Sequence, residues 1–128
     1  MSHVVLLAED DEDNRDLVTF VVKRSRMDIQ LEIAENGQEA VEKAFATNPT
    51  LILMDMQMPV MDGWQAVPIL KADDRTKHIP IVAFTAQAKA EDKARTKEMG
   101  CVEHYTKPMD PEELLNLIQK YLNQGGGS

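Results

Sequence analysis

The sequence LILMDMQMPVMDG, residues 51–63, decides the fold class of this chain. Its first four residues are all apolar, which is the pattern of a strand buried on both faces, and the run ends directly in Asp55. Pro59 and the pair Asp62-Gly63 then predict a loop. A buried strand followed by an acid and a loop is typical of a parallel sheet, in which sites form beyond the carboxyl ends of the strands.

Outward from this stretch, short apolar runs alternate with segments of helical periodicity. We expect strands over residues 4–8, 30–34, 51–54, 79–84 and 102–105, and helices over residues 13–25, 38–46, 64–71, 87–99 and 111–122. Pro68 should kink or shorten its helix, and Gly100 should end the next one. The order βαβαβαβαβα predicts one α/β domain, a parallel sheet with helices on both faces.

Length, charge and composition exclude several classes of protein. The chain has 128 residues, the size of one domain, and 43% of them are apolar, enough for a core. A net charge of −8, from 14 basic and 22 acidic residues, argues against direct nucleic-acid binding, which depends on Lys and Arg neutralising phosphates. A single cysteine, Cys101, excludes an internal disulfide.

Neither a signal peptide nor a membrane span is visible in the sequence. The apolar run at residues 4–8 is too short for either and has no basic residues before it. We therefore expect a cytoplasmic protein without membrane insertion. We expect the folded domain over residues 3–123 and a flexible tail over residues 124–128, because the tail has linker composition.

Five residues able to carry chemistry follow the expected strands: Glu9, Asp10, Asp55, Thr85 and Lys107. A parallel sheet would bring them to one edge. Carboxylates packed together repel one another unless a cation lies between them, and an all-oxygen site suits Mg²⁺. Asp55 is then a plausible nucleophile for an acyl phosphate, with Lys107 and the Thr85 hydroxyl holding phosphate oxygens.

Four stretches resemble the response-regulator receiver family, represented by the bacterial chemotaxis response regulator. They read LLAEDD at residues 6–11, MDMQMPVMDG at 54–63, AFTA at 83–86 and YTKP at 105–108, in the family's order and spacing. The resemblance covers about residues 3–123. It implies a flavodoxin-like, doubly wound (βα)5 fold with a five-stranded parallel sheet in the order 2-1-3-4-5.

The resemblance also implies a role for each site residue. Asp55 resembles the phosphoacceptor, Thr85 the switch hydroxyl and Lys107 the phosphate-contacting lysine. The implied ligands of Mg²⁺ are Asp10 directly, Glu9 largely through metal-bound water, Asp55, and the backbone carbonyl of Gln57. Asp11, the third acid of its run, we assign to a solvated helix start.

The function that the resemblance implies is a stand-alone phosphorylation switch. A sensor histidine kinase or a histidine phosphotransfer protein would donate a phosphoryl group from phosphohistidine to Asp55. The chain would catalyse only its own modification and would not be an enzyme acting on other molecules. With no output domain after residue 123, it would signal through about residues 87–123, by protein contact or onward phosphotransfer.

One position departs from the family's pattern. Three residues before the lysine the family usually has an aromatic side chain that swings inward on activation, and this chain has His104. Two readings stay open: a histidine that rotates and adds pH sensitivity, or an exposed surface residue without a switching role. Gln57 and Gln87, each two positions beyond a site residue, are interpreted as residues that tune hydrolysis of the phosphoryl group.

Two rival functions can be weighed against this prediction. A phosphatase of the haloacid dehalogenase type would also use an acid after a strand, but its general acid two residues later is replaced here by Gln57. The chain also has no room for a cap domain. The alternative that stays open is an interaction module with the receiver fold that works without phosphorylation.

Overall fold

The structure is a computed structural model that describes residues 3–86 and 89–126. Five strands and five helices alternate within these residues. The strands are β1 (His3–Ala8), β2 (Ile29–Ala34), β3 (Leu51–Asp55), β4 (Ile81–Thr85) and β5 (Glu103–Thr106). The helices are α1 (Glu12–Ser25), α2 (Gly37–Thr47), α3 (Gly63–Ala72), α4 (Ala90–Glu98) and α5 (Pro111–Gly126).

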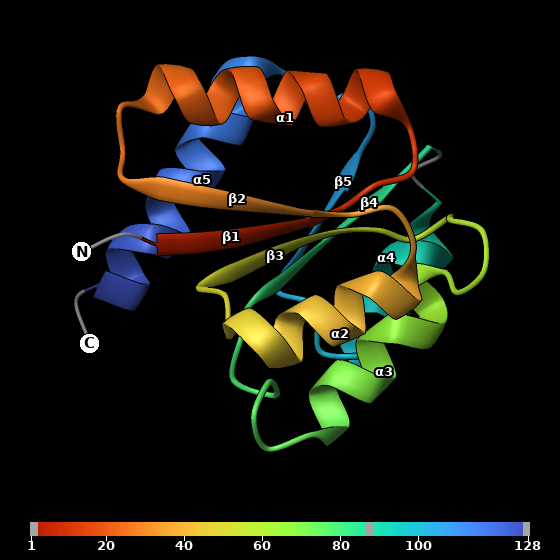
Figure 1. Cartoon of the computed structure of the whole chain (residues 1–128). Coiled ribbons are helices and arrows are strands. Elements are labelled where there is room, and N and C mark those ends of the chain that lie inside the picture. The colour runs from red at the N-terminus through yellow and green to blue at the C-terminus, as the bar shows by residue number, and fades with distance from the viewer. Residues whose placement is uncertain (1–2, 87–88, 127–128) are drawn as a thin grey trace.

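All strand pairs in the sheet are parallel, and the order is β2-β1-β3-β4-β5, as predicted. Figure 1 shows the sheet as the middle layer, with α1 and α5 on one face and α2, α3 and α4 on the other. This is the doubly wound arrangement, in which the chain passes from one side of β1 to the other and places helices on both faces. None of the helices in the described residues is long and apolar enough to cross a membrane.

Side chains of successive strand residues point alternately into two cores. Val5 and Leu7 of β1 face α1 and α5, whereas Leu6 and Ala8 face the other helix layer. The alternation continues along the central strands, where all five residues of β3 and of β4 are buried. Burial on both faces explains why these strands read as uninterrupted apolar runs in the sequence.

Acidic and amide side chains begin the helices at the positions that local chemistry predicts. Asp11 accepts hydrogen bonds from two backbone N–H groups in the first turn of α1, which confirms its assignment to a helix start. Asp62 and Gln65 form a reciprocal capping box at α3, and Asp110 accepts from the backbone of α5. At the end of α4, Gly100 has a φ of +102°, as expected of a terminating glycine.

Three expectations about boundaries differ from the structure. Pro68 does not shorten its helix, because α3 runs through it from Gly63 to Ala72. Within the described residues the fourth helix begins at Ala90, whereas Gln87, its expected start, lies outside them. The backbone of α5 continues to Gly126, so the helical backbone extends beyond residue 123, where we expected the tail to begin.

The loop between β3 and α3 packs tightly because of two glycines. A Cβ on Gly63 would lie 2.6 Å from Met56 Sδ and 2.8 Å from the Asp55 carbonyl oxygen. A Cβ on Gly37 would lie 2.5 Å from the Met61 carbonyl oxygen, which accepts a hydrogen bond from the Gly37 N–H. The glycines therefore allow α2 and α3 to approach the backbone that follows Asp55.

Gly63→Ala is expected to lower the free energy of unfolding by about 1–3 kcal/mol, the usual cost of forcing atoms into a packed site. The clash involves the Asp55 backbone, which cannot move without disturbing the end of β3. Urea unfolding followed by circular dichroism measures the change. An unchanged midpoint would show that the loop adapts to the added methyl group and that the close approach is not required.

Candidate functional site

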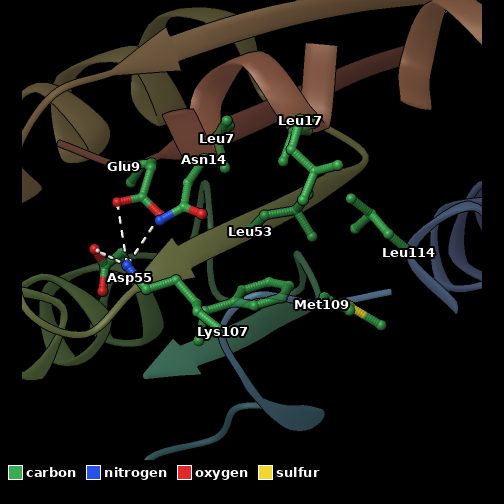
Figure 2. Close-up of a pocket in the computed structure, with 12 residues that line it drawn as sticks. Leu7, Glu9, Asn14, Leu17, Leu53, Asp55, Lys107, Met109 and Leu114 are labelled. Carbon is green, nitrogen blue, oxygen red and sulfur yellow. Dashed lines mark hydrogen bonds and ion pairs between the residues drawn. The ribbon is translucent and has the colours of Figure 1, made fainter. Parts of the chain in front are cut away.

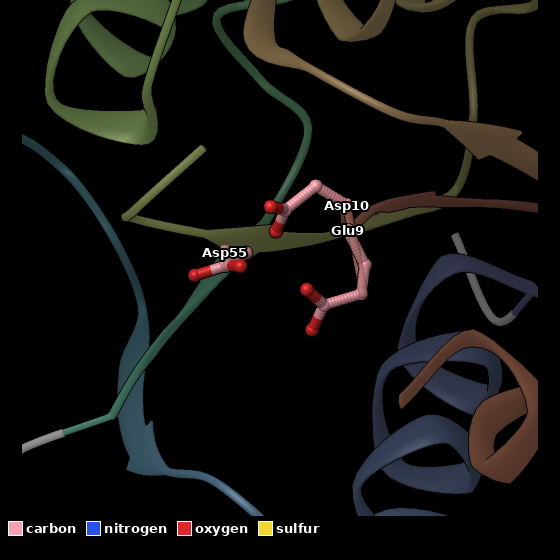
Figure 3. Close-up of side chains that lie close together, drawn as sticks. All are labelled: Glu9, Asp10 and Asp55. Carbon is pink, nitrogen blue, oxygen red and sulfur yellow. The ribbon is translucent and has the colours of Figure 1, made fainter. Parts of the chain in front are cut away.

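Three carboxylates meet where β1 and β3 end. In the sheet register Ala8 lies opposite Met54, so the residues that follow each of them, Glu9 and Asp55, are brought together. One oxygen atom from each of Glu9, Asp10 and Asp55 lies within 4.8 Å of the others, as Figure 3 illustrates. Glu9 and Asp55 are only 3% and 2% exposed, whereas Asp10 is exposed. The cluster thus has a buried floor and an open side.

Lys107 supplies a positive charge to this cluster. Its Nζ atom lies 3.0 Å from Asp55 Oδ2 and 3.1 Å from Glu9 Oε1 (Figure 2). The side chain is 19% exposed, so it approaches the carboxylates from a largely buried position. The backbone N–H of Lys107 donates to the Thr85 carbonyl, which continues the pairing of β4 with β5 to the site. The topology therefore joins residues that are 98 positions apart.

The pKa values of Glu9 and Lys107 each reflect opposing effects of burial and of the neighbouring charged groups. Burial raises the pKa of Glu9, and contact with Asp55 raises it further, to about 7, despite opposing contributions from the Asp11 N–H and from Lys107. For Lys107, burial alone would lower the pKa, but hydrogen bonds and charge from Asp55 and Glu9 outweigh it and raise the pKa. One lysine therefore does not compensate two buried carboxylates completely, and a further cation would be stabilised here.

A small cavity lies behind the charged residues. Its volume is about 30 Å³, room for roughly one water molecule. Its wall is mostly apolar and includes Leu7, Leu17, Leu53 and Met109, as seen in Figure 2. Asn14 of α1 also lines the cavity. The apolar side chains of this wall contribute to the desolvation of Glu9, because they cannot replace the hydrogen bonds of the lost water.

Asp55 is held in one orientation by the chain that follows it. Its Oδ1 atom accepts a hydrogen bond from the Gln57 N–H at 3.0 Å, while Oδ2 faces Lys107. Gln57 itself is exposed. The structure thus gives the Gln57 backbone a contact with the carboxylate that the sequence did not predict. The use of its carbonyl as a metal ligand stays a prediction.

Thr85 ends β4 one residue beyond Phe84, which is the register partner of Asp55, and is 3% exposed. Its hydroxyl lies 3.2 Å from His104 Nε2, and His104 Nδ1 lies 3.0 Å from the hydroxyl of Thr96 in α4. His104 is half-buried, so the reading of it as an exposed surface histidine is wrong. Gln87, proposed to tune hydrolysis, lies outside the described residues.

Two residues with structural roles at the site were not identified from the sequence. Arg15, in the first turn of α1, donates from Nη1 to the carbonyl oxygens of Glu9 and Asp10, at 3.2 and 2.9 Å. Thr96 is 1% exposed and reaches the site through His104. An arginine shortly after five acidic residues, at positions 9–13, could have suggested a partner for that loop. A threonine in a polar helix gives no sign of its contact with a residue of a neighbouring strand.

The donor set fits a hard divalent cation. Carboxylate oxygens are the ligands that Mg²⁺ prefers, and the exposed side at Asp10 leaves room for the water molecules that it retains. The cluster contains no thiolate or imidazole, which would favour softer metals. The raised pKa of Glu9 indicates the same need for positive charge.

Glu9→Gln is expected to stabilise the metal-free protein by up to about 3 kcal/mol at pH 8, because each pKa unit by which folding raises the pKa of Glu9 corresponds to about 1.4 kcal/mol. Since the folded-state pKa of Glu9 is raised from 4.5 to about 7, the wild type loses stability as pH rises through this window. The glutamine variant should not show this loss. Urea unfolding in EDTA at pH 5 and pH 8 measures the difference.

Glu42→Gln, which changes an exposed acid of α2, is the matched control. Because this variant keeps Glu9, its stability should fall between pH 5 and pH 8 as that of the wild type does. A stability difference between Glu9→Gln and wild type that is the same at both pH values would contradict the assignment of an unfavourable charge to Glu9.

Comparisons with known proteins match this chain to response regulators. The family model described as the response regulator receiver domain matches residues 5–119. The polar-differentiation response regulator DivK of Brucella anthropi is 34% identical over 122 residues, which cover 95% of this chain and 98% of that protein.

Solved structures show the same fold. The chemotaxis response regulator CheY4 of Vibrio cholerae superposes with a TM-score of 0.85 at 29% identity, covering 94% of this chain and 99% of that chain. The receiver domain of the sensor histidine kinase PA1611 of Pseudomonas aeruginosa, solved with a magnesium ion in its active-site cleft, gives 0.85 at 26% identity. That match covers 96% of this chain and 99% of that one. The chain therefore belongs to the response regulator receiver domain family.

Proposed function

We propose that this receiver domain accepts a phosphoryl group on Asp55 from a phosphohistidine donor and passes the signal on through protein contacts. The observation that carries the proposal is the buried pairing of Asp55 with Lys107 at 3.0 Å inside a carboxylate cluster. Receiver domains are in general phosphoacceptors that histidine kinases phosphorylate, and the complete set of charged groups is present here. The donor would be a sensor histidine kinase or a histidine phosphotransfer protein.

In the proposed reaction an oxygen of the Asp55 carboxylate attacks the phosphorus atom of the phosphohistidine. The new O–P bond forms as the P–N bond breaks, and the imidazole of the donor leaves with the electron pair of that bond. The Gln57 N–H and Lys107 orient the two carboxylate oxygens from different sides. Preorganised orientation of this kind lowers the entropic part of the barrier.

Charge stabilisation on the phosphoryl group would come from several sources. Lys107, which contacts the Asp55 carboxylate in the free protein, would contact an oxygen of the incoming phosphoryl group. The Thr85 hydroxyl would donate a hydrogen bond to another of these oxygens. Mg²⁺ bound by Asp10, Asp55, the Gln57 carbonyl and, through water, Glu9 would neutralise the remaining charge. The domain would thus catalyse its own phosphorylation and dephosphorylation without acting on another substrate.

The proposed output surface lies on α4, β5 and α5, within residues 87–123. His104 links this surface to Thr85, and therefore to the site. The output would be contact with a target protein or onward phosphotransfer in the cytoplasm. We propose that Gln57 and Gln87, which flank the site in sequence, tune the lifetime of the phosphoryl group.

Intact-mass spectrometry with Mg²⁺ and acetyl phosphate tests the proposed acceptor. The wild type should gain the mass of one phosphoryl group, and the gain should disappear with EDTA. Asp55→Asn should show no gain, because an amide oxygen is a poor nucleophile, whereas Asp11→Asn should retain it, since Asp11 only begins α1.

A fast-hydrolysing acyl phosphate could escape detection, so Mg²⁺-dependent binding of beryllofluoride, a stable mimic of the phosphoryl group, serves as the second readout. Neither a mass gain nor beryllofluoride binding in the wild type would contradict the proposal. It would favour instead a receiver-fold interaction module that works without phosphorylation.

A further inference from the structure

Thr85, His104 and Thr96 form an uninterrupted chain of side-chain hydrogen bonds from the end of β4 to α4. Thr85 Oγ1 lies 3.2 Å from His104 Nε2, and His104 Nδ1 lies 3.0 Å from Thr96 Oγ1. Both hydroxyls are buried, at 3% and 1% exposure, and the imidazole between them is half-buried. The site is therefore joined to α4 through a single titratable ring.

The direction of the bond at Nδ1 follows from the surroundings of Thr96. Its hydroxyl donates to the backbone carbonyl of Lys93, one turn earlier in α4, at 3.0 Å. A carbonyl oxygen can only accept, and a hydroxyl has only one proton to give. Thr96 Oγ1 must therefore accept from His104, which places a proton on Nδ1.

The direction of the bond at Nε2 then follows from the charge of the ring. A neutral imidazole carries one proton, so with Nδ1 protonated the Nε2 atom is an acceptor. The donor in that contact is the Thr85 hydroxyl. Burial lowers the pKa of His104, and so does the nearby charge of Lys93, while Asp92 acts in the opposite direction. Lys97, Cys101 and Glu103 line the surface pocket that His104 and Thr96 also line.

This hydrogen-bond order conflicts with the role proposed for Thr85, which is to donate a hydrogen bond to a phosphoryl oxygen. The following step rests on that proposed function. If the Thr85 hydroxyl donates its hydrogen bond to a phosphoryl group on Asp55, it can no longer donate to His104 Nε2. A half-buried nitrogen without a partner costs free energy. A second proton on the ring removes the cost, because Nε2–H can donate to Thr85 Oγ1 while the Thr85 hydroxyl donates to the phosphoryl oxygen.

We propose that His104 is a positioning residue that couples loading of an anion at Asp55 to the uptake of one proton. In the free protein His104 is neutral and withholds the Thr85 hydroxyl from the site. In the loaded protein it is an imidazolium that supports the Thr85 hydroxyl as a donor to the anion. Since the loaded form binds the extra proton more tightly, the anion should bind more tightly as pH falls through the window between the two titrations.

The first test follows the histidine rings of the wild type by nitrogen-15 NMR, without and with Mg²⁺ and beryllofluoride. The free protein should show His104 protonated on Nδ1 and not on Nε2 above its titration. Loading should raise the pKa of His104, and the ring signals of His3 and His78, the other two histidines, serve as internal controls. This test needs no substitution and so cannot fail through misfolding.

The second test compares beryllofluoride affinity between pH 8 and pH 6 in the wild type and in His104→Phe. Both proteins keep Glu9 and the other carboxylates, so the ratio of the two affinities isolates the histidine. From pH 8 to pH 6 the affinity of the wild type should rise relative to that of His104→Phe. The rise should be up to about tenfold for each unit by which loading raises the pKa of His104. Thr96→Val should remove the preference for Nδ1 protonation, whereas Thr47→Val, which loses a similar bond within α2, should not.

The outcomes separate this inference from the proposed function. Beryllofluoride that binds with Mg²⁺, without any change in the His104 titration and with a flat affinity ratio, would overturn the proton coupling and leave the phosphoacceptor intact. A free protein protonated on Nε2 would overturn the hydrogen-bond order. No binding of beryllofluoride to the wild type would overturn both.

Discussion

The structure of the site depends on the contact of Lys107 with Asp55 and Glu9. Two carboxylates with exposures of 2% and 3% lie against an apolar wall, and one ammonium group lies 3.0 and 3.1 Å from them. Removing charges from water is costly, and a single lysine leaves the pair with a net negative charge. The free domain therefore favours a bound cation, which would in turn offset the negative charge of an incoming anionic group.

The fold holds these charges together by backbone contacts. The register of β1 against β3 brings Glu9 beside Asp55, and the Lys107 N–H bonds to the last residue of β4. Gly63 lets α3 begin directly against the Asp55 carbonyl. Because each contact involves main-chain atoms of buried segments, the backbones that carry the two carboxylates cannot move apart without loss of sheet pairing.

His104 connects this electrostatic arrangement to the surface. It bridges a hydroxyl at the site and a buried hydroxyl of α4, and its two nitrogens are chemically distinct because Thr96 already donates to its own helix. Under the proposed proton coupling, a change in the hydrogen bonding of Thr85 would alter the charge of the ring that contacts Thr96 in α4. An aromatic ring without nitrogen atoms could occupy the same space but could not carry the change through hydrogen bonds.

The sequence by itself determined the order of elements, the parallel sheet and the identity of the residues at the strand ends. These follow from local patterns, such as the apolar run of β3 and the loop residues Asp62 and Gly63 that come before α3. Gly100 likewise ends α4 for a local backbone reason. Pro68 does not shorten its helix, because the helix around it is maintained by packing of its buried face, which local propensity does not include, whereas the kink stays a prediction.

Only the tertiary structure decided how the site residues contact one another. Register between distant strands placed Lys107 against two acids, with a mostly apolar cavity wall behind them. The sequence also did not predict three further contacts. They are the hydrogen bond from the Gln57 N–H to Asp55, the hydrogen bonds from Arg15 to the backbone at Glu9 and Asp10, and the position of His104 between two threonines. Hydrogen-bond direction and desolvation depend on atoms brought together from separate elements, and no pattern along one chain segment encodes them.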